Sequence, residues 1–293
     1  MCDIVIDGDE FMEKIGLLID STTLTRKDLD KYSFIKVAQL KVSFGDEHFD
    51  ESQLTKEEMQ KKVNEGKHFL TSQPSPADFL EQYKNFYDEG YTHVISILLS
   101  SKLSGTYQSA LIAKSMIDYP LKIDVYSPNS AAFGVALGVS KIAEMIEAKK
   151  IYSEVNKRYL TLFKNPFVSF TLGDLDNLIR GGRLNRVQAF LGKILRIKPI
   201  IKMIEGKLEL VKKERSNKAC MEFFLKNIDE YANQYKKVYL DIITLDMFEW
   251  GQKVLEVVKE KYKNVEIHMT DYLSPVFYSH LGNKGFGIAI LAE

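Results

Sequence analysis

The chain has 293 residues, of which 45% are hydrophobic and 27% are charged. This balance predicts a buried core and argues against an intrinsically disordered chain, and the length fits one large domain or two ordinary ones. Forty Lys and Arg residues balance forty Asp and Glu residues. The neutral charge therefore argues against a dedicated nucleic-acid-binding protein.

The cysteine and histidine content excludes two further classes of protein. The two cysteines are Cys2 and Cys220, too few for a disulfide scaffold or a cysteine-rich zinc module, and they fit a reducing compartment. The histidines lack metal-ligand spacing such as H-E-x-x-H. The acidic start MCDIVIDGDEFMEK does not resemble a signal peptide, and no apolar run reaches the roughly 18 residues of a membrane span. We therefore expect a soluble cytoplasmic protein without metal or cofactor.

Apolar strands alternate with helices over residues 14–150. The expected strands are 14–20, 34–44, 92–99 and 121–127, and the expected helices are 55–65, 76–89, a helix that includes 103–111, and 135–146. Ser75 and Pro76 suit the N-cap and first position of the second helix. Such an alternation predicts an α/β fold with a parallel, doubly wound sheet.

The pattern changes after about residue 160. The expected elements are a strand within 165–175, a hairpin over 198–214 turning at Glu205-Gly206, helices at 216–235 and 247–262, and strands at 238–245, 264–269 and 285–291. This mixture predicts an α+β unit with a mostly antiparallel sheet. We therefore expect two domains, residues 1–160 and residues 161–293.

The segment Ser100–Tyr107 joins a predicted buried strand to a helix. Ligands of open parallel sheets bind outside the carboxyl ends of the strands, and a helix N-terminus offers unpaired amides to an anion. No acidic residue lies between 100 and 117, so an external carboxylate or phosphate could bind there. Ordinary N-capping by Ser101 or Ser104 is the alternative. The chain has neither a G-x-x-x-x-G-K-[ST] phosphate loop nor a G-x-S-x-G nucleophile elbow.

Three further segments carry polar groups that could face a ligand. In TSQPSP (71–76) the prolines fix hydroxyls on a rigid turn, although Ser75 could simply cap a helix. His280 precedes three closely spaced glycines and could donate to an anion or serve a structural role. Arg180 and Arg183 flank a glycine pair, and guanidinium groups suit carboxylate or phosphate recognition.

Read together, these motifs resemble those of the DegV family, whose members bind fatty acids. The similar stretches are DST (20–22), TSQPSP (71–76), SSKLSGTYQSA (100–110), LIRGGRL (178–184), IKPII (197–201) and the His-x-Gly segment 280–282. They occur in the family's order from about Lys14 onward. One departure is Asn283-Lys284, where the family usually continues His-x-Gly with Pro-Gly.

The resemblance implies one long-chain fatty acid bound between two domains. Its carboxylate would be held by Thr71, Ser72, Ser101, Ser104 and His280. Arg180 and Arg183 would make secondary or partner contacts. Similar bacterial proteins are the fatty-acid-binding subunit of fatty acid kinase, and a separate ATP-binding subunit phosphorylates the carboxylate for phospholipid synthesis. The resemblance thus implies a lipid-binding protein that is not itself an enzyme, with at most transient membrane contact.

Two other functions stay open at this level. A serine-dependent acyl hydrolase could use Ser104 and His280, although it would also need an orienting group and an oxyanion hole. A lipid-sensing regulatory protein would bind a similar ligand but act on another partner. The apolar helix face over 135–146, beside Gly134, Ala136 and Gly138, is either a wall of the acyl tunnel or plain core packing.

Overall fold

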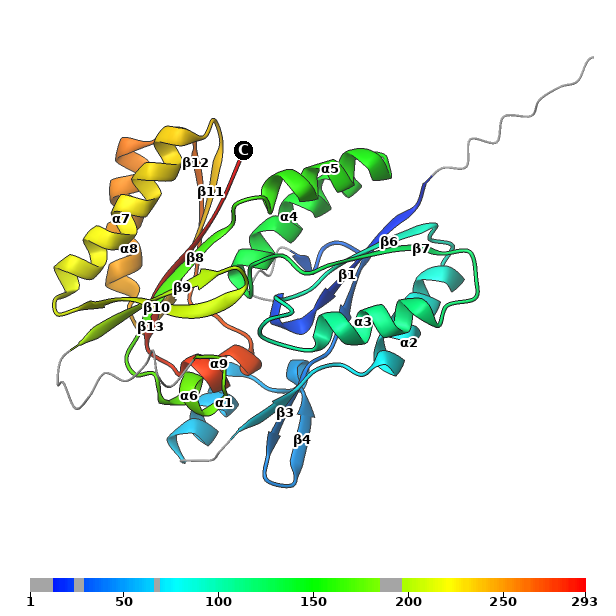
Figure 1. Cartoon of the computed structure of the whole chain (residues 1–293), viewed down its shortest axis with the longest axis horizontal. Coiled ribbons are helices and arrows are strands. Elements are labelled where there is room, and N and C mark those ends of the chain that lie inside the picture. Colours follow the sequence, from blue (N-terminus) through cyan, green and yellow to red (C-terminus); the bar gives the residue numbers. More distant parts are fainter. Residues whose placement is uncertain (1–12, 24–28, 66–68, 185–196) are drawn as a thin grey trace, which may run out of the picture.

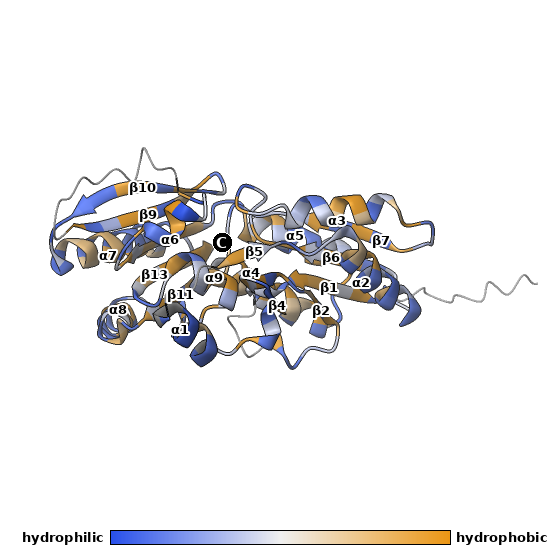
Figure 2. Cartoon of the chain, turned by 90° about the horizontal axis from the view of Figure 1, so that it is seen from below, coloured by the Kyte–Doolittle hydropathy of each residue, from blue (hydrophilic) through white to orange (hydrophobic). Residues whose placement is uncertain are grey.

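The computed structural model describes residues 13–23, 29–65, 69–184 and 197–293. Cys2 and the acidic N-terminal segment therefore lie outside the described residues. Two main sheets lie side by side, and a small third sheet with several short helices lies at the junction between them (Figure 1). The helices that flank the sheets carry both hydrophilic and hydrophobic residues (Figure 2).

The first sheet has the strand order β2-β1-β6-β7, and all of its neighbours are parallel. The strands are β1 (Ile15–Asp20), β2 (Ile35–Ala38), β6 (His93–Ile97) and β7 (Lys122–Tyr126). Successive residues of β1 point to opposite faces. Leu18 packs with α2 (Pro76–Asp88) and α3 (Thr106–Ser115), while Leu17 packs with α4 (Phe133–Glu147) and α5 (Tyr152–Leu162). The predicted doubly wound α/β arrangement is confirmed.

The second sheet has the order β10-β9-β8-β13-β11-β12. Its strands are β8 (Phe167–Leu172), β9 (Lys198–Ile204), β10 (Lys207–Glu214), β11 (Val238–Leu245), β12 (Val265–Thr270) and β13 (Gly285–Ala292). Its pairs are antiparallel except β11–β12, which is parallel because α8 (Phe248–Lys261) provides a crossover. With α7 (Asn217–Gln234) and α8 packed against it, it confirms the predicted α+β part.

The third sheet was not predicted. It consists of β3 (Lys41–Phe44), β4 (Glu47–Asp50) and β5 (Leu70–Ser72), paired antiparallel in the order β4-β3-β5. The single strand expected over 34–44 is therefore wrong, because β2 and β3 belong to different sheets. Around this sheet lie η1 (Ser21–Thr23), η3 (Glu51–Gln53), α1 (Lys56–Asn64), α6 (Asp176–Arg180) and α9 (Pro275–Leu281).

Helix α4 joins the two main sheets. A Cβ on Gly138 would overlap the ring of Phe163, so this glycine allows the helix to pack closely. The Lys141 ammonium bonds to Glu144 of its own helix at 2.7 Å and to Glu266 of β12 at 2.6 Å. Nearby, Arg158 of α5 forms an ion pair with Glu293 and donates to the Tyr239 hydroxyl at 2.8 Å. The apolar face of α4, which we expected to be either a wall of the acyl tunnel or part of the core, is part of the hydrophobic core.

Candidate ligand-binding site

A cavity of about 290 Å³ lies where the third sheet, α3, α6 and α9 meet. This volume is at the lower end of the range of small-molecule sites, about 300–1,000 Å³. The apolar lining consists of Leu40, Leu99, Leu103, Leu178, Leu208, Val276, Phe277 and Leu281. A polar cluster completes the lining, and it consists of Thr71, Ser72, Gln73, Ser104, Arg183 and His280. Both halves of the chain therefore contribute to one cavity.

Thr71 and His280 meet at the cavity. Thr71 lies in β5, His280 lies in the last turn of α9, and the Thr71 Oγ1 is 3.0 Å from the His280 Nε2. Burial, together with a smaller effect of the positive charge of Arg183, lowers the pKa of His280 to about 4. The imidazole is therefore neutral at pH 7, with one nitrogen that donates and one that accepts.

Gly181 makes room for this histidine. The glycine caps α6, and a Cβ built on it would lie 2.5 Å from the His280 Nδ1. Its φ of −69° suits any residue, so space rather than backbone conformation requires glycine here. The first glycine of the RGGR motif thus has a packing role beside the imidazole.

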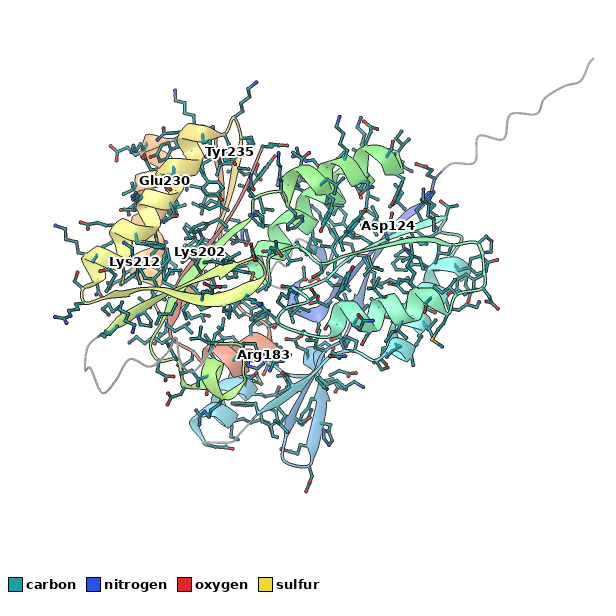
Figure 3. The ribbon with its side chains drawn as sticks, viewed as in Figure 1. Asp124, Arg183, Lys202, Lys212, Glu230 and Tyr235 are labelled. Carbon is teal, nitrogen blue, oxygen red and sulfur yellow. The ribbon has the colours of Figure 1, made fainter. Side chains whose placement is uncertain are left out.

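Arg183 brings a positive charge to the cavity, at the junction shown in Figure 3. Its Nε donates to the Leu103 carbonyl at 3.1 Å, and its Nη1 donates to the Gly181 carbonyl at 2.6 Å. These bonds hold the guanidinium against both halves of the chain. Burial lowers its pKa from the ordinary value, yet an arginine keeps its charge at neutral pH.

Ser104 lies immediately before α3. Its Oγ is 2.9 Å from the Thr106 Oγ1 and accepts from the Thr106 amide at 3.3 Å. Gly105 is the N-cap residue and makes no side-chain cap bond, and the first turn contains no acidic residue. The alternative interpretation makes Ser101 or Ser104 an ordinary N-cap, but Gly105 holds that position instead, although the Ser104 Oγ accepts from the first amide of α3. Ser75 does cap α2, accepting from the Asp78 amide at 3.2 Å.

The structure gathers most of the predicted site residues but separates two of them. Ser101 is exposed, its amide donates to the Ser127 Oγ at 2.7 Å, and it lines a different, open hollow of about 490 Å³. Arg180 is exposed and donates to the Asn177 Oδ1 at 3.0 Å. The other five predicted residues line the cavity, and they are Thr71, Ser72, Ser104, Arg183 and His280.

Sequence reasoning missed Gln73 and the apolar lining. Gln73 sits within the quoted TSQPSP motif, and its Nε2 donates to the Ser109 Oγ of α3 at 3.2 Å. A Cβ on Gly105 would overlap the Gln73 amide, so the absence of a side chain at Gly105 leaves room for the Gln73 side chain. The TSQPSP motif could have indicated Gln73 as a site residue. The leucines of the lining come from distant segments, and no local sequence pattern indicates that they share one cavity.

The surroundings limit the chemistry of the site. Within the described ranges, no group of three or more His, Cys, Asp or Glu side chains is arranged to hold a metal ion. Within the same ranges, no helix combines the length and apolar character needed to span a bilayer. The cavity offers leucine surface together with hydroxyl, amide, imidazole and guanidinium groups, a combination that suits an apolar ligand with an anionic end.

Comparisons with known proteins identify the family of this chain. A DegV domain-containing protein of Staphylococcus aureus strain N315 is 30% identical over 284 residues, which cover 96% of this chain and 98% of that protein. A DegV family protein from Thermus thermophilus, described by its fatty acid binding, has a TM-score of 0.83 at 30% identity, covering 96% of this chain and 100% of its own. DegV of Bacillus subtilis, described as a fatty acid binding protein, has a TM-score of 0.84 at 28% identity, with the same coverage. The family model described as "Uncharacterised protein, DegV family" matches residues 14–293, and the chain belongs to this family.

Proposed function

We propose that this protein binds one long-chain fatty acid in the cavity, with the acyl chain against the leucines and the carboxylate on the polar cluster. The observation that carries this proposal is the meeting of Thr71, Ser104 and His280 within a polar cluster at one cavity whose other lining residues are apolar. The two solved relatives described as fatty-acid-binding, from Thermus thermophilus and Bacillus subtilis, support it. In the proposal, the strand–helix junction of residues 1–160 binds the carboxylate together with His280 and Arg183, and residues 161–293 close over the acyl chain.

The energetics suit such a ligand. Each buried methylene contributes about 0.8 kcal/mol, so a chain of ~16 carbons gains on the order of 12 kcal/mol before association and ordering costs. A carboxylate taken from water needs several hydrogen-bond donors. The neutral imidazole and the hydroxyls supply donors, and Arg183 adds the charge that an anion favours.

We propose further that the bound carboxylate is presented to a separate ATP-binding kinase subunit. A carboxylate oxygen would attack the γ-phosphorus of ATP, forming an acyl phosphate and releasing ADP, and the acyl phosphate would enter phospholipid synthesis. The sequence given supports a partner because it contains no G-x-x-x-x-G-K-[ST] loop. A cytoplasmic location belongs to this proposal.

The geometry does not favour the hydrolase alternative. A serine hydrolase needs its nucleophile beside the base. Here the His280 Nε2 contacts Thr71, and the Ser104 Oγ contacts Thr106. A lipid-sensing regulator would bind the same ligand and would differ in its partner.

Mass spectrometry of lipid extracted from protein purified without added ligand tests the binding proposal. We expect stoichiometric long-chain fatty acid, and a protein that carries none and takes up none would refute it. A second assay adds ATP and the kinase subunit and traps acyl phosphate with hydroxylamine. Absence of the trapped product from lipid-loaded protein would refute the presentation role alone.

A further inference from the structure

Two buried carboxyl groups lie outside the lining of the cavity. Asp20 ends β1 and is fully buried, while Glu51 begins η3 with 2% of its surface exposed. The Asp20 charge raises the pKa of Glu51, although burial is the larger cause. Buried acidic side chains are rare unless they are paired, so the contacts of Glu51 require an explanation.

Glu51 connects the N-terminal half to α9. Its Oε1 accepts from the Val276 amide at 2.7 Å, and its Oε2 accepts from the Ser21 hydroxyl. The Ser21 Oγ in turn accepts from the Leu40 amide at 2.9 Å. Val276 lies in the first turn of α9, where amides have no partner within the helix, and the N-cap Ser274 makes no side-chain cap bond. The Glu51 carboxyl supplies the missing acceptor from another part of the fold.

Helix α9 is one wall of the cavity. It contributes Val276, Phe277, His280 and Leu281 to the lining. The helix follows β12 in sequence but packs against α1, β3, β5 and η1, as Figure 1 shows for α1 and β3. A group that holds its first turn therefore also fixes His280, one turn later.

We propose that Glu51 is a positioning residue whose buried carboxyl anchors the first turn of α9 and so sets how readily this helix lifts away to exchange the ligand. The inference rests on the proposed function for the nature of the ligand, whereas the anchoring itself is a property of the fold. It predicts faster helix opening when the acceptor is removed. It also predicts that the rate of helix opening depends on pH.

The direction of that dependence follows from the burial of the carboxyl. Burial raises the pKa of Glu51 from its ordinary value of 4.5 to about 7, against the lowering effect of the bonds from Ser21, Ser274 and Val276. When α9 lifts, water reaches the carboxyl and its pKa falls toward the ordinary value. The closed form therefore binds the proton more tightly, and raising the pH from about 5 to about 7 favours opening.

Other titratable groups lie near Glu51, and the effect of one of them on the pH dependence must be distinguished from the effect of Glu51. Burial raises the pKa of Asp20 on β1 to about 6, but this carboxylate accepts from Thr22 and from the Leu99 amide. Burial also raises the pKa of Tyr272, which precedes α9 and faces Glu51 and Glu57. On α9 itself, the pKa is about 12 for Tyr278 and about 4 for His280. Asp20 is thus the competing group in the neutral range.

Two measurements on the full chain test the proposal. The first is hydrogen exchange of peptides covering 275–281, corrected for the intrinsic effect of pH on amide exchange. The second is release of cis-parinarate, a fluorescent long-chain fatty acid, into excess oleate. We expect both rates to rise at least tenfold in the wild type between roughly pH 5 and pH 8, because each unit by which the pKa of Glu51 in the closed form exceeds its pKa in the open form allows up to about tenfold.

Two substitutions separate anchoring from ionisation. Glu51→Ala removes both the acceptor and the titrating group, and we expect both rates to be independent of pH and about tenfold above the wild-type rates at pH 5. Glu51→Gln keeps an acceptor for Val276 without a titrating group, and we expect slow rates that no longer depend on pH. A structural role alone would not remove the pH dependence while leaving the helix closed.

Matched controls identify the responsible carboxyl. Glu57→Gln removes an exposed charge from α1 and should keep the wild-type pH profile. Asp20→Asn should keep a pH dependence but move it to lower pH, because the Asp20 charge raises the pKa of Glu51. A wild-type pH profile in Glu51→Gln, or unchanged exchange of 275–281 in Glu51→Ala, would overturn the proposal. If Glu51→Ala does not fold, the pH dependence of the two rates in Glu51→Gln tests the proposal by itself. Failure of the wild type to bind cis-parinarate would refute the proposed function, while hydrogen exchange would still decide the role of Glu51.

Discussion

The Thr71 hydroxyl and the His280 imidazole contact each other at 3.0 Å, although 209 residues separate them in sequence. The contact joins β5 of the N-terminal half to α9 of the C-terminal half and brings the two parts of the polar cluster together. Either residue alone would be an ordinary polar side chain. Their meeting beside Ser104 and Arg183 gives the cavity its polar component.

Removing the hydroxyl donors should weaken retention of the ligand. We expect the double variant Thr71→Ala and Ser104→Ala to retain at least tenfold less fatty acid, because a hydrogen bond to a charged group contributes about 1.5–3 kcal/mol. Lipid per protein after gel filtration, quantified by mass spectrometry, measures the effect. Ser101→Ala is the matched control because Ser101 lies outside the cavity lining. Unchanged lipid occupancy in a folded double variant would refute the assignment.

His280→Ala should impair phosphorylation at least as strongly as binding. A side chain that orients the carboxylate affects the reaction geometry as well as the affinity. Parallel measurements of fatty acid retention and of kinase-dependent acyl phosphate formation would show the difference. Wild-type phosphorylation rates in this variant would contradict the orienting role.

Gly181→Ala should disturb His280 without removing any polar group. The new Cβ would lie 2.5 Å from the His280 Nδ1 and 3.1 Å from the Asn177 carbonyl oxygen, so the imidazole must move from Thr71. We expect about a tenfold loss of fatty acid affinity, similar to the loss of one charged hydrogen bond. Gly173→Ala serves as the control because its nearest neighbour, the Lys284 Cβ, would be at an acceptable 3.4 Å. Equal affinities of the two variants would contradict the packing role.

The effect of the Arg183 charge should be measurable as a change in the pKa of His280. Arg183 lowers the pKa of His280, so Arg183→Gln should raise that pKa toward the ordinary 6.5. Nuclear magnetic resonance of the imidazole protons during a pH titration measures the change. Arg180→Gln removes a nearby exposed charge and should leave the titration as it is. Identical titrations in both variants would show that Arg183 does not act on the imidazole.

His280 should also make the fold sensitive to acid. Its folded pKa of about 4 lies below the ordinary 6.5, so its contribution to the free energy of unfolding is present above pH 6.5 and is lost as the pH falls toward 4. The loss is at most about 3 kcal/mol. Asp20 and Glu51 act in the opposite direction, because their raised pKa values cost stability as the pH rises toward about 6 and 7. Urea unfolding at several pH values should show a smaller acid loss in His280→Gln, and equal losses would contradict this.

The sequence was most informative where local pattern and burial coincide. The apolar runs of β6 and β11 predict buried strands, and every residue of β11 is buried. The family resemblance, carried by TSQPSP and SSKLSGTYQSA, predicted the fold class and is confirmed by the match over 14–293. These features depend on residues that are neighbours in the chain.

Features set by distant partners could not be predicted in the same way. Residues 34–44 read as one strand because propensity does not reveal that β2 pairs with β1 while β3 pairs with β4 and β5. Ser101 and Ser104 were both predicted to contact the carboxylate, with Ser104 preferred, yet the turn between them directs only Ser104 to the cavity. The short helices α6 and α9 were missed because tertiary contacts rather than length stabilise them.

Strand β13 is the last strand in sequence, yet it lies between β8 and β11 inside its sheet. During synthesis, β8 and β11 leave the ribosome before the strand that must separate them. The sheet can therefore close only after β13 has been synthesised, when this later segment inserts between two earlier ones. We expect nascent chains stalled before Gly285 to remain sensitive to protease in this half and to be unable to hold a lipid.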